Sequence, residues 1–265
     1  MVIDTKKILI ISGSVRKKGD GYKITQSFIE KLRGGNNFEW EYLYLNDYEI
    51  KGCIGCKVCI RKNEESCPLK DDLLNIVNRL NEADGFIFTS PVYSLAVTSQ
   101  MKAFIDRTNY LLHRPTLIGK PTIVISTTDL AGTKGVIKYL RHIIITLGMR
   151  YTGGLGVKMG AYKNNETYKQ KTEQKIEKLA LAFKTSMDAG NQQRPFFRQA
   201  LTFKGWQTRM AVTKDKNPYD YAYWSERGWM DADYFYPTTI KWPTKIITSL
   251  LKKRLTKVMK EGFIR

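Results

Sequence analysis

The stretch KKILIISGSVRKKGDGYKITQSFIEKL, residues 6–32, decides the fold of this chain. Its first part, residues 6–12, is a short apolar run rich in β-branched side chains, which is typical of a strand buried on both faces. From about Tyr22 to Leu32 the apolar residues recur at the spacing of one helix face. Between them lies a loop of glycine, serine and basic residues. The stretch therefore predicts a strand, a small-residue loop and a helix.

The same order repeats along residues 1–189. We expect further strands at 38–45, 85–90, 121–127 and 150–158, and further helices at 72–80, 98–112, 133–147 and 166–187. Five such units in a row indicate an α/β fold with a doubly wound, five-stranded parallel sheet and helices on both faces. In such sheets the ligand lies beyond the carboxyl ends of the strands. Function is therefore expected in the loops after the first, third and fourth strands.

Residues 190–265 lack this alternation. We predict a C-terminal extension, mostly helical or irregular, that packs on the domain of residues 1–189. Aromatic residues are concentrated in the segment 219–237, and a basic helix pattern runs from about 243 to 261. The aromatic segment either caps the ligand site or buries its rings against the sheet.

The charge balance favours acidic partners. The 265 residues include 44 Lys and Arg against 25 Asp and Glu, a formal net charge of +19. This balance suits nucleic acid, anionic lipid or an acidic protein. Because no helix-turn-helix, zinc-finger or aromatic-platform motif accompanies it, we do not expect nucleic-acid binding. The segment 243–261 either makes a peripheral membrane contact or packs on its own protein, and packing is preferred.

No part of the sequence predicts a membrane span. A spanning helix needs ~20 apolar residues in a row, and no run approaches that length. The short apolar run near the start also lacks the features of a secretory signal. We therefore expect a cytoplasmic protein.

Three loops carry residues suited to a ligand. In residues 12–24, small side chains let backbone N–H groups approach a phosphate, and Arg16 adds a positive charge. In residues 89–108, Pro91 fixes an extended turn and Tyr93 offers a planar face. Residues 126–135 bring hydroxyls and glycines to the same end of the sheet. Each loop alone fits an ordinary connection, and the combination points to a ligand.

Together, GSxR after the first strand and SPVY…S…K…IDR after the third resemble the NAD(P)H-dependent FMN reductase branch of the flavodoxin-like fold, over residues 5–185. The resemblance implies FMN as cofactor, with NAD(P)H as an electron source. It implies no catalytic side chain, because the flavin itself does the chemistry. Its phosphate would contact Ser14 and Arg16. The candidate cofactor-binding residues are Ser12, Ser14, Arg16, Gly21, Tyr22, Pro91, Val92, Tyr93, Ser94, Thr127, Thr128 and Asp129.

One position departs from that family. Its members usually have Asn followed by Ser or Thr where this chain has Asp20 and Gly21. A carboxylate then lies where a phosphate should approach, and like charges at close range disfavour binding. We expect weaker FMN retention than in a typical relative, unless Lys17, Lys18 or Lys23 compensates or Asp20 turns away.

The four cysteines of the chain form a compact motif, C-x2-C-x2-C-x7-C, made of Cys53, Cys56, Cys59 and Cys67. Four thiolates are the ligand set of a [4Fe–4S] cluster, and three of them at this spacing resemble the bacterial ferredoxin run. Zinc uses the same ligands but usually pairs two C-x2-C knuckles across a longer spacer. Reduced thiols without metal are the third alternative. The cluster is preferred.

This motif, with the Asp71–Asp72 pair after it, resembles the iron–sulfur flavoproteins. The resemblance implies a cluster that passes single electrons to FMN, often across the interface of a homo-oligomer, and an acidic ferredoxin as donor, which a basic surface would attract. We predict an FMN-dependent oxidoreductase of this type. The alternatives are an NAD(P)H-dependent reductase of FMN, quinones or nitro compounds without a cluster, and a non-enzymatic electron carrier or redox sensor that could associate with membranes.

Overall fold

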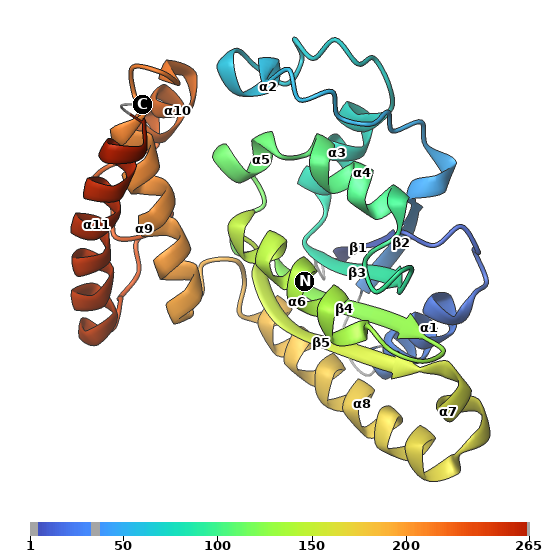
Figure 1. The fold of residues 1–265 in the computed structure, drawn as a ribbon. Helices are drawn as coiled ribbons and strands as arrows, with labels where there is room; N and C mark the ends of the chain where they lie inside the picture. Colours follow the sequence, from blue (N-terminus) through green and yellow to red (C-terminus); the bar gives the residue numbers. More distant parts are fainter. Residues whose placement is uncertain (1–4, 33–37, 264–265) are drawn as a thin grey trace.

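The computed structural model describes residues 5–32 and 38–263. Its centre is a five-stranded sheet in the order β2-β1-β3-β4-β5, with every neighbouring pair parallel (Figure 1). This confirms the flavodoxin-like, doubly wound sheet. The strands are β1 (Lys6–Ser12), β2 (Phe38–Tyr44), β3 (Gly85–Pro91), β4 (Pro121–Thr128) and β5 (Arg150–Lys158).

Helices cover both faces of the sheet. In chain order, the helices of the described residues are α1 (Asp20–Leu32), α2 (Val58–Arg61), α3 (Leu73–Glu82), α4 (Ser99–Arg107), α5 (Tyr110–His113), α6 (Thr133–Thr146), α7 (Met159–Asn164), α8 (Glu166–Asp188), α9 (Phe197–Val212), α10 (Pro218–Glu226) and α11 (Trp242–Phe263), with a 3₁₀ turn at Leu45–Asp47.

Two apolar cores form because successive strand side chains point to opposite faces of the sheet. Ile8 and Ile10 of β1 pack with α1 and α8 on one face. Leu9 and Ile11 pack with α3, α4 and α6 on the other. This double burial explains the continuous apolar run that opens the sequence.

The helix expected over residues 98–112 is two helices. The chain turns at Thr108, whose φ and ψ are −87° and 11°. Its hydroxyl donates back to the carbonyls of Phe104 and Ile105 at 2.9 and 3.3 Å. Such side-chain bonds compete with continued helix formation. Helix α5 then places His113 and Arg114 near the cysteine loop.

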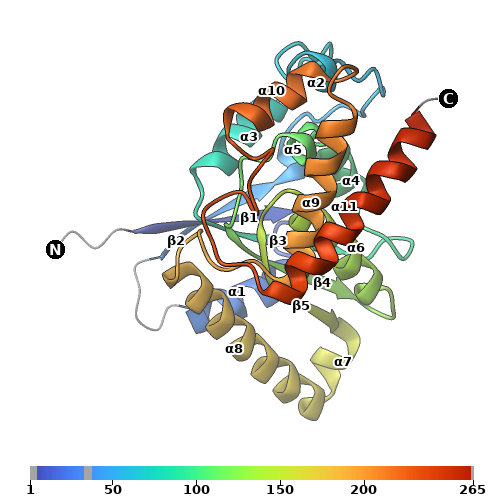
Figure 2. The ribbon, with the colours of Figure 1, turned by 90° about the vertical axis from the view of Figure 1, so that its left-hand side faces the viewer.

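Beyond α8, the helices α9, α10 and α11 lie to one side of the sheet, with α9 and α11 packed together (Figures 1 and 2). The aromatic segment 219–237 builds a small core on α9, in which Trp224, Tyr234 and Phe235 surround Phe203. Its rings therefore pack on α9 and on one another. They do not form part of the two cores on the faces of the sheet, and a role of the segment as a cap on the ligand site stays a prediction. The division of the chain at residue 190 stays a prediction.

Candidate functional site

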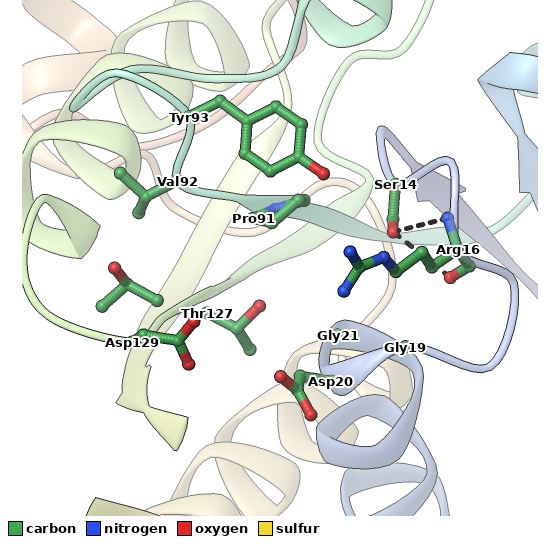
Figure 3. A pocket seen from close by; sticks show the side chains of 11 residues that line it. Ser14, Arg16, Gly19, Asp20, Gly21, Pro91, Val92, Tyr93, Thr127 and Asp129 are labelled. Carbon is green, nitrogen blue, oxygen red and sulfur yellow. Dashed lines mark hydrogen bonds between the residues drawn. The ribbon is translucent and has the colours of Figure 1, made fainter. Parts of the chain in front are cut away.

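A pocket opens at the carboxyl ends of β1, β3 and β4, where the order of the sheet reverses between β1 and β3 (Figure 3). Ligands of doubly wound sheets bind at such switch points. The pocket encloses about 510 Å³, including space open to solvent. Its lining residues are Ser14, Arg16, Gly19, Asp20, Gly21, Pro91, Val92, Tyr93, Thr127, Thr128 and Asp129.

Nine of the twelve candidate cofactor residues line this one pocket. The other three lie beside it. Ser12 is buried, and its Oγ accepts the Ser14 N–H at 3.3 Å, so it supports the first loop. The Tyr22 ring packs against Tyr42, with centroids 5.4 Å apart. Ser94 lies in the tight turn that follows Tyr93. Contact of the nine with FMN stays a prediction.

The first loop is folded back on itself by its own hydrogen bonds. Ser14 Oγ accepts the Arg16 N–H at 3.1 Å and donates to the Arg16 carbonyl at 3.2 Å. The Gly19 N–H donates to the same carbonyl at 3.1 Å. In Figure 3 the Arg16 guanidinium extends into the pocket, near the first residues of α1. A cation and a helix N-terminus together suit a phosphate.

Gly21 is needed for the close approach of α1 to β3. A Cβ at this position would lie 2.9 Å from Thr89 Oγ1, closer than such atoms come in proteins. The serine or threonine usual in the family would therefore meet Thr89 here. The loss of that hydroxyl is a consequence of how this chain packs.

Asp20 is neutralised by a residue that the sequence analysis missed. Its carboxylate pairs with Lys163 of α7, Nζ to Oδ1 3.0 Å. Lys17, one of the three lysines expected to compensate, instead pairs with Asp47 at 2.7 Å. Lys163 lies on a helix that follows β5, and no local sequence signal connects it to the first loop.

The second loop reverses in a two-residue turn that displays Tyr93. Tyr93 and Ala96 exchange backbone hydrogen bonds of 3.0 and 2.9 Å, and the two residues between them have positive φ, 49° at Ser94 and 62° at Leu95. Left-handed non-glycine residues cost roughly 1–2 kcal/mol each, so the surrounding structure must hold them. The Tyr93 side chain remains 48% exposed at the pocket, where it can face a planar ring.

The four cysteines lie on the loop between β2 and α3, around the single turn of α2. All four are free thiols, Cys53 and Cys56 exposed, Cys59 and Cys67 half-buried. Burial raises the pKa of the Cys59 thiol, and the other three cysteines raise it further. Within residues 5–32 and 38–263, no three His, Cys, Asp or Glu side chains are close enough to hold a metal ion. The thiols are thus within electrostatic reach but not in a coordination geometry.

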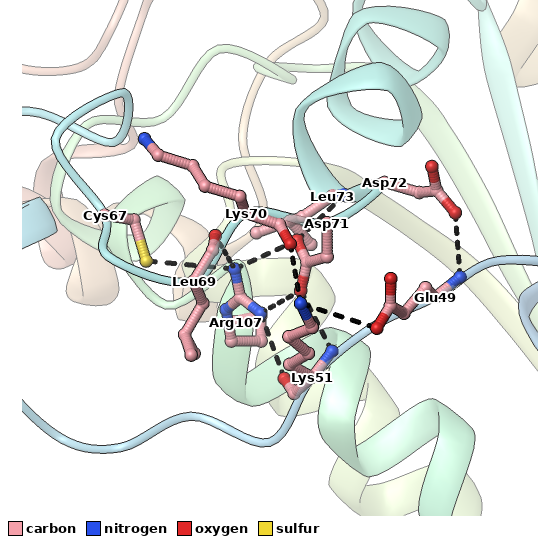
Figure 4. A network of polar contacts seen from close by, with 9 residues as sticks. All are labelled: Glu49, Lys51, Cys67, Leu69, Lys70, Asp71, Asp72, Leu73 and Arg107. Carbon is pink, nitrogen blue, oxygen red and sulfur yellow. Dashed lines mark hydrogen bonds and ion pairs between the residues drawn. The ribbon is translucent and has the colours of Figure 1, made fainter.

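A buried ion pair holds the two ends of this loop together (Figure 4). Arg107 pairs with Asp71, and their side chains are 3% and 1% exposed. The same guanidinium donates to the Lys51 carbonyl at 3.0 Å and to Cys67 Sγ at 3.8 Å. Although burial alone would raise the pKa of Asp71, hydrogen bonds from Arg107 and from backbone N–H groups hold it below its usual value.

A second buried arginine joins the loop to α10. Arg114 donates to the Cys59 carbonyl at 2.6 Å and to Glu64 at 3.0 Å. It also pairs with Asp220, whose other carboxylate oxygen lies 2.7 Å from His113 Nδ1. The sequence gives no signal of this contact, because its partners are 106 residues apart.

Comparison with known proteins agrees with this arrangement. Residues 6–163 match the family described as NADPH-dependent FMN reductase. An iron–sulfur flavoprotein of Archaeoglobus fulgidus is 31% identical over 231 residues, which cover 84% of this chain and 100% of that protein.

Two solved structures share the fold. RosB with bound 8-demethyl-8-formylriboflavin-5′-phosphate superposes with a TM-score of 0.56 at 14% identity, over 90% of this chain and 92% of that chain. FerB, an NAD(P)H:acceptor oxidoreductase from Paracoccus denitrificans, gives 0.51 at 17% identity, over 70% and 99%. At these identities they support the fold alone. The family match spans more than half of the chain, and the archaeal flavoprotein is covered from end to end. This chain therefore belongs to the NADPH-dependent FMN reductase family, among its iron–sulfur flavoproteins, and is an FMN-dependent oxidoreductase.

Proposed function

We propose that the chain passes electrons between FMN, bound in the pocket of Figure 3, and a [4Fe–4S] cluster bound by Cys53, Cys56, Cys59 and Cys67. The observation that carries this proposal is the cysteine loop itself. It holds every cysteine of the chain and is fastened by two buried arginines, Arg107 and Arg114. A loop without a structural task would not need buried charges at both attachments.

The residues present fit FMN. Arg16 and the first turn of α1 would hold the phosphate, while the backbone from Pro91 to Tyr93 and from Thr127 to Asp129 would border the ring. Bound FMN supplies a redox group for one or two electrons, and the protein only has to bind it and exclude competing reactions. Replacing Arg16 by glutamine should weaken FMN binding roughly tenfold to a hundredfold, as expected for a hydrogen bond to a charged group. Lys18→Gln, an exposed position outside the pocket, is the control.

The donor set also fits a cluster. Burial raises the pKa of Cys59 most, and the other three thiols raise it further. Four thiolates on so short a loop would repel one another, and bound iron would offset that repulsion. The N–H that Arg107 donates to Cys67 Sγ would stabilise this thiolate as a ligand. A [4Fe–4S] cluster supplies single-electron transfer at such a site.

The test is an absorption spectrum with iron, sulfide and zinc analysis of anaerobically purified protein. We expect flavin bands above a broad cluster absorption, with about four irons per chain. Cys67→Ser should lose iron and keep FMN, while the neighbouring Ser66→Ala should keep both. Flavin bands without iron in the wild-type protein would refute the cluster.

A cluster-free, NAD(P)H-dependent reductase of FMN, quinones or nitro compounds is the second candidate. It is favoured by the separation of the thiols, since the described part of the chain holds no preformed metal-binding group. Rapid steady-state oxidation of NAD(P)H by the iron-free protein would establish it. Oxidation of NAD(P)H by Cys67→Ser at the wild-type rate would also support this cluster-free reductase.

We further propose a homo-oligomer and an acidic ferredoxin as the electron donor. The net charge of +19 supports the second proposal, because opposite charges steer transient electron-transfer partners together. The association rate with a reduced ferredoxin should then fall steeply with ionic strength. Sedimentation velocity measures the oligomeric state, and a monomer at all concentrations would refute the proposed homo-oligomer.

A further inference from the structure

Helix α11 has two different sides. One side packs against α9 through the buried Thr248 and the half-buried Leu251, Leu255 and Met259, which recur at helical spacing. The opposite side faces away from the rest of the molecule, at the left edge in Figure 1 and nearest the viewer in Figure 2. The packing expected from the sequence therefore accounts for only one side of this helix.

The outward side is apolar in its first half. Trp242, Ile246, Ile247 and Leu250 are 73%, 50%, 47% and 62% exposed, and they follow one another within two and a half turns. Scattered exposed apolar residues are normal in proteins, but a contiguous group of this kind marks a binding surface. The four exposed apolar side chains are not needed to hold α11 on α9, because Thr248 and Leu251 pack there on the other side of the helix.

The outward side is strongly basic in its second half. Lys253, Arg254 and Lys257 are all exposed, and across residues 5–32 and 38–263 none of them forms an ion pair with an acidic side chain. The helix carries one acidic residue, Glu261. A partner that covers this surface must therefore bring negative charge next to apolar groups.

We propose that the outward side of α11 binds an anionic lipid bilayer, with Trp242, Ile246, Ile247 and Leu250 inserted below the headgroups and with Lys253, Arg254 and Lys257 in contact with lipid phosphates. Interfacial helices have this composition, in which aromatic and aliphatic side chains enter the membrane and Lys and Arg contact the headgroups. The helix lies on the surface and does not span. None of the helices in the described part of the chain has the length and apolar composition to cross a bilayer.

A second copy of the chain fits this surface less well. If two α11 helices paired in parallel, their cations would face each other. If they paired antiparallel, the cations of each copy would lie against the apolar residues of the other, without anions to balance them. The lipid surface supplies both the apolar layer and the negative charge.

Membrane binding through α11 leaves the flavin pocket accessible. Figure 1 places α11 on the side of the molecule opposite to the carboxyl end of β4, one of the strand ends at which the pocket opens. The proposal is therefore independent of which electron donor or acceptor the pocket uses.

The test is co-sedimentation of the full-length, FMN-loaded protein with vesicles of equal parts phosphatidylcholine and phosphatidylglycerol, or of phosphatidylcholine alone. We expect binding to the anionic vesicles that weakens with salt, and much weaker binding to the neutral ones. The double variant Lys253→Gln, Lys257→Gln should bind the anionic vesicles about thirtyfold more weakly, at ~1 kcal/mol per charge near the surface.

Two charge-matched variants separate insertion from electrostatic attraction. Ser249→Asp adds a negative charge at an exposed position next to the apolar group and should weaken binding about fivefold. Leu250→Asp adds the same charge and also removes an inserted side chain, so it should weaken binding by a further factor of roughly ten or more. Unchanged FMN content and melting temperature would show that both variants fold.

Two results would overturn the proposal. The first is equal vesicle binding by Ser249→Asp and Leu250→Asp, which would reduce the effect to general charge attraction. The second is no binding of wild-type protein to anionic vesicles at low salt. If Leu250→Asp in that case dissociated an oligomer in sedimentation velocity, a second copy of the chain would be the occupant.

Discussion

Replacing Asp220 by asparagine tests whether buried charges fasten α10 to the cysteine loop. The Asp220 side chain is 1% exposed and pairs with His113 and with Arg114, which itself is 4% exposed and holds the Cys59 carbonyl. Asparagine keeps the shape of the side chain but removes its charge. The guanidinium would then be left with Glu64 as its remaining carboxylate partner.

The expected loss is large because the pair is out of contact with water. Breaking a buried ion pair by removing one partner costs about 3–5 kcal/mol. In proteins of roughly this size 1 kcal/mol changes the melting temperature by about 2–4 °C, so Asp220→Asn should melt roughly 6–20 °C lower. The measurement is thermal and urea unfolding, followed by circular dichroism and by tryptophan fluorescence, to which Trp224, whose indole donates to the His113 carbonyl, contributes.

Asp233→Asn is the matched control. Asp233 also pairs with two cations, Lys245 at 2.6 Å and Lys204 at 3.8 Å, but its side chain is 46% exposed. Solvent screens such pairs, and their loss costs about 0–1 kcal/mol. If the two variants lost the same stability, or if Asp220→Asn stayed within about 1 kcal/mol of wild type, the reasoning from burial would be refuted. If Asp220→Asn binds a full complement of iron, α10 does not support the cysteine loop.

Three further predictions follow from single contacts. Asp20→Asn should raise the affinity for FMN and Lys163→Gln should lower it, because the lysine neutralises the carboxylate beside the phosphate site. Flavin fluorescence titration measures both affinities, and a lower affinity in Asp20→Asn or a higher one in Lys163→Gln would contradict this account. Gly132→Ala should lower the free energy of unfolding by more than about 1 kcal/mol, since φ is +102° and the new Cβ would lie 2.6 Å from the loop after β3, while Gly135→Ala, with its Cβ in ordinary contact, should be nearly neutral or stabilising. The pKa of Asp71 is lowered in the folded state, so its contribution to stability is present above the unfolded value of about 3.9 and is lost as the pH falls below it. Urea unfolding between about pH 3 and pH 6 should show a fall in stability at the acid end that Asp71→Asn lacks, and parallel curves would exclude the effect.

The sequence by itself determined the sheet and the location of its pocket. Strand and helix periods are read from neighbouring residues, and Ile8 to Ile11 carry the signal for burial on both faces. Five strand-and-helix units in a row leave few topologies open, because parallel crossovers are right-handed. The carboxyl ends of the strands then bring the loops at Ser14, Tyr93 and Thr127 together. The cysteine motif is local too, so its spacing alone was enough to predict a metal or redox site.

Only the tertiary structure decided which distant charges meet and which helix sides stay uncovered. Lys163 reaches Asp20, and Arg114 reaches Asp220, across more than a hundred residues. No period or spacing encodes such pairs, since they depend on how whole elements pack. The same is true of α11, whose sequence pattern fits both packing and membrane contact. Because α9 occupies the side with Thr248, the side with Trp242 and Leu250 is left facing solvent.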